Sequence, residues 1–176
     1  ECFMDNRDLK RLVKAIFAML GQKPDAFGIV LDEDGWISTK ELHQALMAEP
    51  GFPYITSKAL KQFFPLYRPE KFEWQEDRVR VKPEWQSPGL TIYKKVIPPE
   101  PLYVTIRPKA HAHVIAHGLR PGGNKRWIVL STDKEMALRI GRRRDRDPIM
   151  AEILALKACK AGLVFRRAGD LLYLVQ

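Results

Sequence analysis

The sequence contains very little cysteine, and its two cysteines, Cys2 and Cys159, are far apart. Because there is no Cys-x-x-Cys motif, we expect neither a disulfide framework nor a structural zinc site, and the pattern suits a reducing cytosol. Long apolar runs are missing too, since none approaches the roughly 20 residues that a membrane span needs. The first residues also lack the basic-then-apolar pattern of a secretory signal. These absences predict a cytoplasmic protein without a metal site.

Acidic residues are the minority among the charges. The chain has 21 Asp and Glu against 30 Lys and Arg, which gives a formal net charge of +9. Such an excess favours a polyanionic partner, either nucleic acid or a ligand rich in phosphate. The length of 176 residues fits one domain or two small lobes.

The stretch 130–144, LSTDKEMALRIGRRR, carries the densest positive charge. A buried strand is predicted just before it, and Ser131 or Thr132 is expected to cap a helix that ends near Gly141. Arginines gather around the last turn of this helix: Arg139, Arg142, Arg143 and Arg144. The combination predicts a site for a phosphate-bearing ligand. The alternative is an exposed helix whose C-terminal dipole attracts cations.

The N-terminal half has the pattern of three helices and a hairpin. The helices are predicted from apolar spacing and capping residues at 8–20, 39–47 and 57–64. Residues 27–31 predict a short strand or extended segment, and 72–81 predict a β-hairpin that turns at Glu76 and Asp77. Together these elements predict a winged-helix-like module over residues 5–90, a scaffold that often binds nucleic acid.

Prolines are concentrated between residues 82 and 101, which predicts a linker with a lobe boundary near residues 90–98. The second lobe, over residues 91–176, is expected to contain about five strands and to be α+β. Its strands are predicted at 102–106, 127–130 and 148–156 and as a hairpin around 168–170, and its helices at 108–117, 130–141 and 156–161.

Four tryptophans and a histidine pair are further candidates. Trp36 and Trp74 alternate with apolar residues and are predicted to be core, whereas Trp85 is the better candidate for stacking on a base. His113 and His117 have a spacing that metal sites use, but no third ligand lies near them in the sequence, so we expect them to face solvent.

Taken in this order, the segments resemble the NAD-dependent RNA (tRNA) 2′-phosphotransferase family. The segment GIVLDEDGWISTKELHQAL at 28–46 is similar to the family pattern Gly-x-x-Leu-Asp-x-x-Gly-Trp. The segment 118–143 resembles its strand, Leu-Ser-x-Asp turn and Gly-Arg-Arg helix, and PPEPLY at 98–103 resembles the entry to its NAD lobe. The resemblance implies an N-terminal winged-helix-like RNA-binding lobe and a C-terminal ADP-ribosyltransferase-like lobe.

The resemblance also implies a reaction. In this family the RNA 2′-phosphate attacks the ribose carbon next to nicotinamide, and the neighbouring ribose hydroxyl then releases ADP-ribose cyclic phosphate and a repaired RNA. The residues that match positions of catalytic arginines are Arg80, Arg142 and Arg143. The residues that match cofactor positions are Tyr103, Thr105 and Ser131. Nucleic acid is expected to contact Arg80, Trp85, Arg142 and Arg144.

Several family residues are replaced. Gly21 and Gln22 stand where the family has Arg-His, and Val104-Thr105-Ile106 stands where it has His-Gly-Thr. Other family residues are replaced by Pro83, Trp85, Trp127, Val129 and Arg144. Loss of one well-placed charged stabiliser typically costs about 3 kcal/mol of barrier. The resemblance therefore predicts a divergent protein that binds 2′-phosphorylated RNA or a phosphorylated nucleotide, with NAD as a possible cofactor and with weak or no catalysis.

Two alternatives remain open at this point. The first is an active NAD-dependent RNA 2′-phosphotransferase, either with the alignment shifted by one or two residues or with a histidine of the next helix, His111, His113 or His117, in place of those lost. The second is a different ligand or a protein partner on the same scaffold. The sequence does not indicate an oligomeric state.

Overall fold

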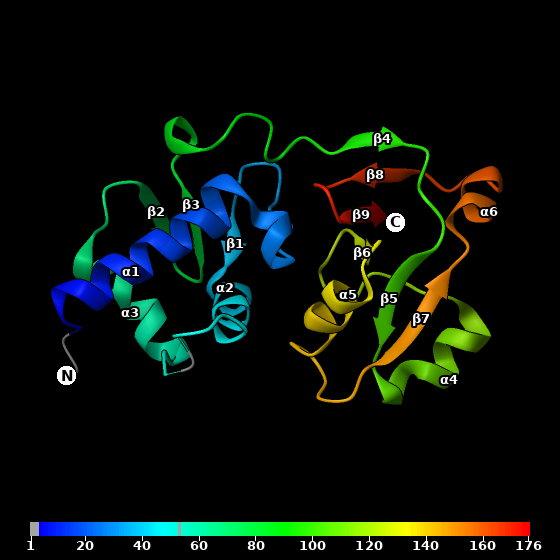
Figure 1. The fold of residues 1–176 in the computed structure, drawn as a ribbon, viewed down its shortest axis with the longest axis horizontal. Coiled ribbons are helices and arrows are strands. Elements are labelled where there is room, and N and C mark those ends of the chain that lie inside the picture. Colours follow the sequence, from blue (N-terminus) through cyan, green and yellow to red (C-terminus); the bar gives the residue numbers. More distant parts are fainter. Residues whose placement is uncertain (1–3, 53) are drawn as a thin grey trace. The chain divides into compact units, whose positions relative to one another are not determined.

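The computed structural model describes residues 4–52 and 54–176. The chain forms two compact units that divide between Ile92 and Tyr93. Each unit has its own helices and its own sheet (Figure 1). The predicted α+β class is therefore confirmed.

Three α-helices of the first unit lie close to their predicted positions. They are α1 (Asn6–Phe17), which continues into the π-turn η1 (Ala18–Gln22), α2 (Thr39–Met47) and α3 (Ser57–Tyr67). Each begins at a side-chain oxygen that accepts a hydrogen bond from a backbone N–H of the first turn, supplied by Asp5, Ser38 and Thr56. These caps satisfy N–H groups that have no partner within the helix, so the sequence alone locates the helix starts well.

The sheet of the first unit has three antiparallel strands in the order β1-β3-β2. Its strands are β1 (Ile37–Ser38), β2 (Phe72–Gln75) and β3 (Arg78–Val81). The last two form the predicted hairpin. Of the two alternatives predicted at 27–31, the strand does not form. Pro24–Phe27 form a 3₁₀ helix, η2, the N–H of Ile29 donates back to the Pro24 carbonyl at 2.9 Å, and residues 29–31 belong to no helix or strand.

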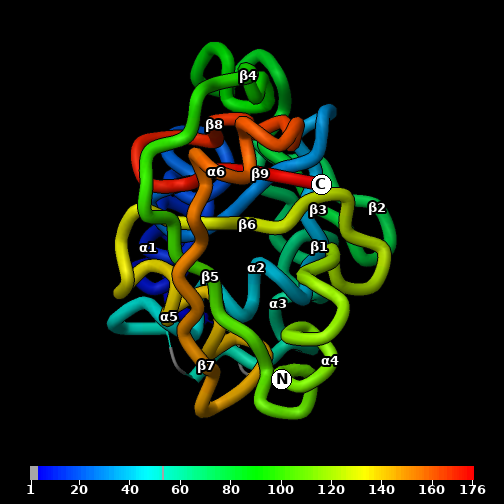
Figure 2. Tube along the Cα trace, turned by 90° about the vertical axis from the view of Figure 1, so that its right-hand side faces the viewer, coloured from blue at the N-terminus to red at the C-terminus, as the bar shows by residue number. Residues whose placement is uncertain are grey.

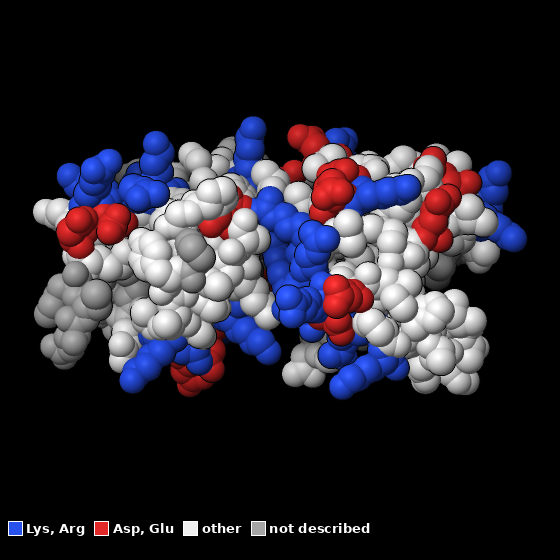
Figure 3. Space-filling view, turned by 60° about the horizontal axis from the view of Figure 1, so that its bottom comes forward, with Lys and Arg blue, Asp and Glu red and all other residues white. Residues whose placement is uncertain are grey.

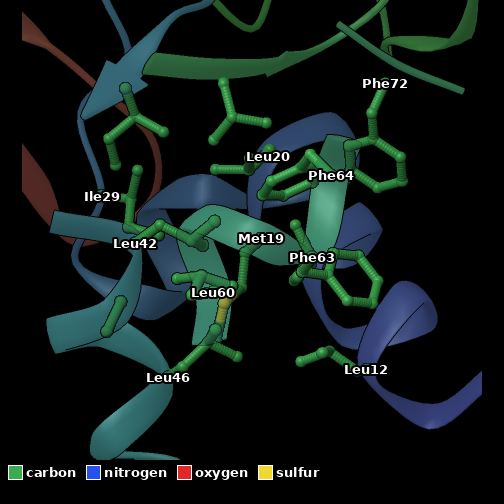
Figure 4. Packing of buried hydrophobic residues seen from close by; sticks show 14 of the residues in the cluster. Leu12, Met19, Leu20, Ile29, Leu42, Leu46, Leu60, Phe63, Phe64 and Phe72 are labelled. Carbon is green, nitrogen blue, oxygen red and sulfur yellow. The ribbon is translucent and has the colours of Figure 1, made fainter. Parts of the chain in front are cut away.

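The core of the first unit lies between its three helices and its sheet. Figure 4 shows leucines and phenylalanines of α1, α2 and α3 pointing toward one another, with Met19 and Leu20 among them. Trp36 is also buried, at 8% exposure, and Trp74 packs against the edge of this cluster. The buried position predicted for Trp36 is therefore confirmed, whereas Trp74 is only half-buried at the edge of the core.

The second unit is built on a six-stranded sheet in the order β4-β8-β9-β6-β5-β7, in which every neighbouring pair is antiparallel (Figure 2). The strands are β4 (Lys94–Val96), β5 (Leu102–Ile106), β6 (Ile128–Ser131), β7 (Ile149–Ile153), β8 (Phe165–Arg167) and β9 (Leu172–Val175). The edge strand β4 lies inside the stretch predicted to be a linker. Three residues between proline-rich segments gave no strand signal, and pairing with β8 supplies the hydrogen bonds that hold β4.

The helices of the second unit are α4 (Pro108–His117), α5 (Lys134–Gly141) and α6 (Ala155–Lys160). Leu102 of β5 packs in one apolar cluster with Ala155 of α6. Side chains alternate along a strand, so the face with Tyr103 and Thr105 is the opposite one, which α5 covers at Thr105. The prediction that Ser131 or Thr132 caps α5 is wrong, because the Asp133 carboxylate accepts the bond from the Met136 N–H at 3.2 Å.

Cysteines, helix length and groups of metal-binding side chains are features for which the composition set expectations. Cys2 lies outside the described residues, and Cys159 is a half-buried free thiol. Within residues 4–52 and 54–176, none of the helices combines the length and the apolar character that crossing a membrane requires. In the same part of the chain no group of three or more His, Cys, Asp and Glu side chains is arranged to hold a metal ion.

Candidate anion-binding site

A close contact between α5 and β5 sets the position of the arginine-rich turn. A Cβ at Gly141 would overlap Oγ1 of Thr105 and would lie 2.8 Å from the Thr105 Cβ. Real Cβ atoms essentially never approach other atoms closer than 3.0 Å, so only glycine lets the last turn of α5 lie this near the strand. The residues that follow Gly141 therefore start from a fixed point above the sheet.

The turn after α5 presents three consecutive arginines on a hydrogen-bonded backbone. The N–H of Arg142 donates to the Leu138 carbonyl at 2.9 Å, and the N–H of Arg144 donates to the Gly141 carbonyl at 3.0 Å. Arg142 and Arg144 are exposed, whereas Arg143 is half-buried. We call this segment, Arg142–Arg144, the arginine turn. The structure thus brings together the three arginines that the sequence assigned to a site.

A fourth arginine stands behind the turn. Burial, and to a smaller extent repulsion by Arg139, lower the pKa of the Arg143 guanidinium to about 10. Burial also lowers the pKa of Arg139, one helical turn earlier. Arg139 belongs to the group of arginines that the sequence predicted around the last turn of the helix, and its spacing of four residues from Arg143 favours one shared face.

The loop before β6 adds a lysine to the same group of charges. Crowding by surrounding protein atoms lowers the pKa of the Lys125 ammonium to about 8, and repulsion by Arg144 and then Arg143 contributes in the same direction. The loop also contacts the turn, since a Cβ at Gly122 would lie 3.3 Å from Nη1 of Arg144. The sequence alone gave no reason to expect Lys125 here, because 18 residues separate it from Arg143.

Four cations from two segments therefore lie close enough to interact. Besides burial, Arg144 and Arg143 lower the pKa of Lys125, and Arg139 lowers the pKa of Arg143. We call Lys125, Arg139, Arg143 and Arg144 the cationic cluster. Concentrated like charge disfavours the charged form of each member, and an anion in contact with the cluster would remove that cost. The space-filling view shows how Lys and Arg side chains gather on the surface (Figure 3).

The three residues at cofactor positions have different surroundings. Thr105 is packed under α5 at Gly141. Ser131 is 1% exposed, and its Oγ accepts a hydrogen bond from the Asp133 N–H at 3.0 Å. Tyr103 is half-buried, with the Lys134 ammonium 5.2 Å from the centre of its ring. The Ser131 hydroxyl is thus used in a turn, and Thr105 is covered by the last turn of α5, so this set by itself does not fit the ribose groups of NAD.

Arg80 lies in the first unit and is tied to its neighbours on the sheet. Its Nε donates to Oε2 of Glu73 at 2.7 Å, and its Nη1 donates to the Asp34 carbonyl at 2.9 Å. The guanidinium also lies over the Trp36 ring, 4.7 Å from the centroid. Glu73 is the cross-strand partner of Arg80, so Arg80 joins β2, β3 and the turn at Asp34. These contacts give Arg80 a structural role whatever ligand it meets.

Trp85 is 43% exposed, as the prediction of a stacking position requires. The Lys71 ammonium lies 4.6 Å from the Trp85 ring centre and 4.7 Å from that of Phe17, so one cation contacts two aromatic faces. This arrangement holds the indole at the surface of the first unit beside a positive charge, which suits a base and its phosphate.

The histidines of α4 remain at the surface. His111, His113 and His117 are all exposed, and the rings of the last two lie 4.6 Å apart. The prediction that His113 and His117 face solvent is therefore confirmed.

The chain is similar to several known proteins over most of its length. A protein of Acetivibrio thermocellus named "Probable RNA 2′-phosphotransferase" is 26% identical over 167 residues, which are 95% of this chain and 91% of that protein. One of the same name from Streptomyces coelicolor is 29% identical over 94% of this chain and 89% of its own length. "Probable RNA 2′-phosphotransferase 2" of Archaeoglobus fulgidus is 25% identical over 96% of this chain and 77% of that protein.

No family model matches the chain. The curated matches nevertheless extend through both units and agree with one another in name. These matches, at 25–29% identity over most of the chain, support its resemblance to the RNA 2′-phosphotransferase family.

Proposed function

We propose that this protein binds RNA or a phosphorylated nucleotide through its arginine turn and cationic cluster, with weak or no catalysis. The observation that carries the proposal is the arginine turn, which the close contact of Gly141 with Thr105 holds above the sheet with Arg142 and Arg144 exposed. A phosphate bound at this turn would offset the repulsion among neighbouring cations with charge-assisted hydrogen bonds. The net charge of +9 supports the same class of partner.

The two units have separate roles in this proposal. The first acts as a winged-helix-like RNA-binding lobe, which its three helices and β-hairpin support. Arg80 and Trp85 are its proposed contacts with RNA, Arg80 through the guanidinium donors that Glu73 and Asp34 leave over. The second unit acts as an ADP-ribosyltransferase-like lobe in which Arg142, Arg143 and Arg144 meet phosphate. A reducing, cytoplasmic setting suits such a partner and the low cysteine content.

Weak or absent catalysis follows from the residues around β5. When bound, NAD would supply an electrophilic ribose carbon for a 2′-phosphate to attack. The side chains of Val104 and Ile106 offer no hydrogen-bond donor to a ribose, while the Ser131 hydroxyl is used in a turn and Thr105 is packed against Gly141. Tyr103 remains the most available hydroxyl among the proposed cofactor residues, so we assign no step through NAD.

The test separates binding from turnover. An oligonucleotide with one internal 2′-phosphate, and the same oligonucleotide without it, are titrated with the protein and then incubated with labelled NAD. We expect tighter binding of the phosphorylated strand and no labelled product. Arg142→Met with Arg143→Met should abolish the preference, whereas the equally charged control Lys94→Met with Lys95→Met should keep it.

Either of two results would contradict this reading. Labelled product that disappears in the Arg142→Met variant would establish the active 2′-phosphotransferase instead. Equal affinity for the two strands would remove the 2′-phosphate from the proposal.

A further inference from the structure

Trp85 lies on a segment that is fixed to two parts of the first unit. The segment consists of the 3₁₀ helix η3 (Pro83–Trp85) and the two residues after it. Nε2 of Gln86 donates to the Val81 carbonyl of β3 at 2.8 Å, and the N–H of Ser87 donates to the Gly21 carbonyl of η1 at 2.8 Å. The backbone that follows Trp85 is therefore held to both β3 and η1.

A third part of the unit lies against the same segment. Gly35 has a φ of +83°, and a Cβ there would lie 2.5 Å from Nε2 of Gln86. Glycine thus lets the turn before β1 approach the Gln86 amide while that amide keeps its bond to Val81. A ring on such a fixed segment loses little conformational freedom when a ligand binds. Trp85 is therefore well placed for recognition.

Lys71 determines how the indole is presented. Its ammonium lies 4.6 Å from the centre of the Trp85 ring and 4.7 Å from the centre of the Phe17 ring. Phe17 packs at the edge of the core, with its ring nearly perpendicular to that of Phe72. The Lys71 carbonyl accepts a hydrogen bond from the Lys82 N–H at 2.8 Å, which fixes the backbone of the lysine. The ammonium thus covers one face of the indole, and Trp85 is still 43% exposed, so a flat ligand can approach the other face.

The Lys71 ammonium also keeps hydrogen-bond donors for a ligand. Within residues 4–52 and 54–176 it forms no ion pair, and its described interactions are those with the two rings. Ring faces attract a cation by their charge distribution and do not use up its three N–H donors. A phosphate beside the indole would accept charge-assisted hydrogen bonds from this ammonium.

We propose that Trp85 and Lys71 form a stacking site for one unpaired RNA base. The indole takes the base, and the Lys71 ammonium meets a neighbouring phosphate. This inference rests on the proposed function, because it names the class of RNA that the first unit accepts. It assigns single-stranded or looped RNA to this unit and excludes duplex RNA from the site.

The requirement for an unpaired base follows from the geometry of stacking. In a duplex each base is covered by its neighbours, and an A-form helix presents its backbone and 2′-hydroxyls to a protein. A fixed indole can therefore contact the face of a base only where the strand leaves that base unstacked. Every base has such a face, so the site should favour single strands without selecting a sequence.

The first experiment removes the base from one partner and the ring from the other. Fluorescence anisotropy measures the affinity of the full chain for a short oligouridine, for an abasic strand with the same backbone and for a duplex of equal length. Trp85→Ala should weaken binding of oligouridine about 5- to 150-fold and should leave binding of the abasic strand and the duplex unchanged. Trp85→Phe keeps a ring and should retain most of the affinity. Tyr54→Ala, which removes another exposed aromatic side chain of the same unit, should have no effect.

Lys71→Met tests the phosphate contact. Methionine keeps an apolar side chain beside the two rings while the charge is lost. The slope of log K against log salt concentration is negative, and its magnitude should fall by about 0.7 for the oligouridine and for the abasic strand, the value of one single-strand phosphate contact. Lys71→Arg should restore the slope, because arginine also binds aromatic faces and phosphate. Lys10→Met, at an exposed position on α1, should not change it.

Two results would overturn this site. One is a Trp85→Ala effect that is absent on oligouridine or equal on the oligouridine and the abasic strand, and the other is an unchanged salt slope in Lys71→Met. If the protein still prefers the 2′-phosphorylated strand through Arg142 and Arg143 alongside either result, the proposed function stands. The two failures are therefore distinguishable.

Discussion

Gly141→Ala is expected to destabilise the second unit, although alanine is the better helix former. The new Cβ would overlap Oγ1 of Thr105 and would lie 2.8 Å from its Cβ and 3.0 Å from its Cγ2. Overpacking of this kind costs about 1–3 kcal/mol. Higher helix propensity returns up to about 1 kcal/mol, and less at the final residue of a helix. The net loss should be about 1–2 kcal/mol in the free energy of unfolding.

A second substitution tests the cause. Thr105→Ala removes two of the three atoms that the new methyl group meets, so Gly141→Ala should cost at least about 1 kcal/mol less in that background. Urea denaturation followed by circular dichroism measures all four proteins. Gly122→Ala is the matched control, since its Cβ meets only the flexible end of Arg144, at 3.3 Å, and should cost less than about 1 kcal/mol.

Additive effects of the two substitutions, within about 0.5 kcal/mol, would refute the argument. In that case α5 would not rest on Thr105, and Thr105 would regain its place among the residues available to a cofactor.

Three further results are expected. Nη2 and Nε of Arg80 lie 2.6 and 2.7 Å from Oε2 of Glu73. A double-mutant cycle of Arg80→Met and Glu73→Gln should therefore show a coupling of about 1 kcal/mol in urea denaturation. Additive effects would contradict the structural role of Arg80. Trp85→Ala should weaken binding of single-stranded RNA by about 1–3 kcal/mol while costing below about 1 kcal/mol of stability through its contact with Lys71, and unchanged RNA affinity would exclude stacking. The pKa of Lys125 is about 8 in the folded protein and about 10.4 in the unfolded chain, so between these pH values the unfolded chain binds more protons. The free energy of unfolding, relative to that of Lys125→Met, should therefore rise by about 1 kcal/mol from pH 7.5 to 9.5, after discounting for the exposure of Lys125. A fall over this range would contradict the depressed pKa.

Local signals explain most of what the sequence predicted correctly about the fold. The hairpin over 72–81 and the helix starts at Ser38 and Thr56 follow from alternation and capping residues that act within a few positions. The differences occur where a hydrogen-bond partner decides that the local pattern does not reveal. Residues 29–31 form no strand, because the Ile29 N–H donates to the Pro24 carbonyl instead, and β4 exists because β8 lies beside it.

The candidate site shows the same division. The arginine turn could be read directly from three consecutive residues after a helix stop. Lys125 could not, because its approach to Arg144 depends on a loop turn that closes in three dimensions. The engagement of Thr105 and Ser131 was also hidden, since Thr105 meets Gly141 only through packing and the Ser131 hydroxyl is used by a turn two residues later.

The salt dependence of RNA binding tests most directly whether the arginine turn meets phosphate. The affinity for single-stranded RNA is measured by fluorescence anisotropy from 50 to 300 mM salt for the wild type, for Arg142→Met with Arg144→Met, and for Lys94→Met with Lys95→Met. The slope of log K against log salt concentration is negative, and each lost phosphate contact reduces its magnitude by about 0.7. We expect the double arginine substitution to reduce this magnitude by about 1.4. The double lysine substitution removes the same charge and should leave the slope nearly unchanged. Equal slopes for the two double variants would contradict a phosphate site at the arginine turn.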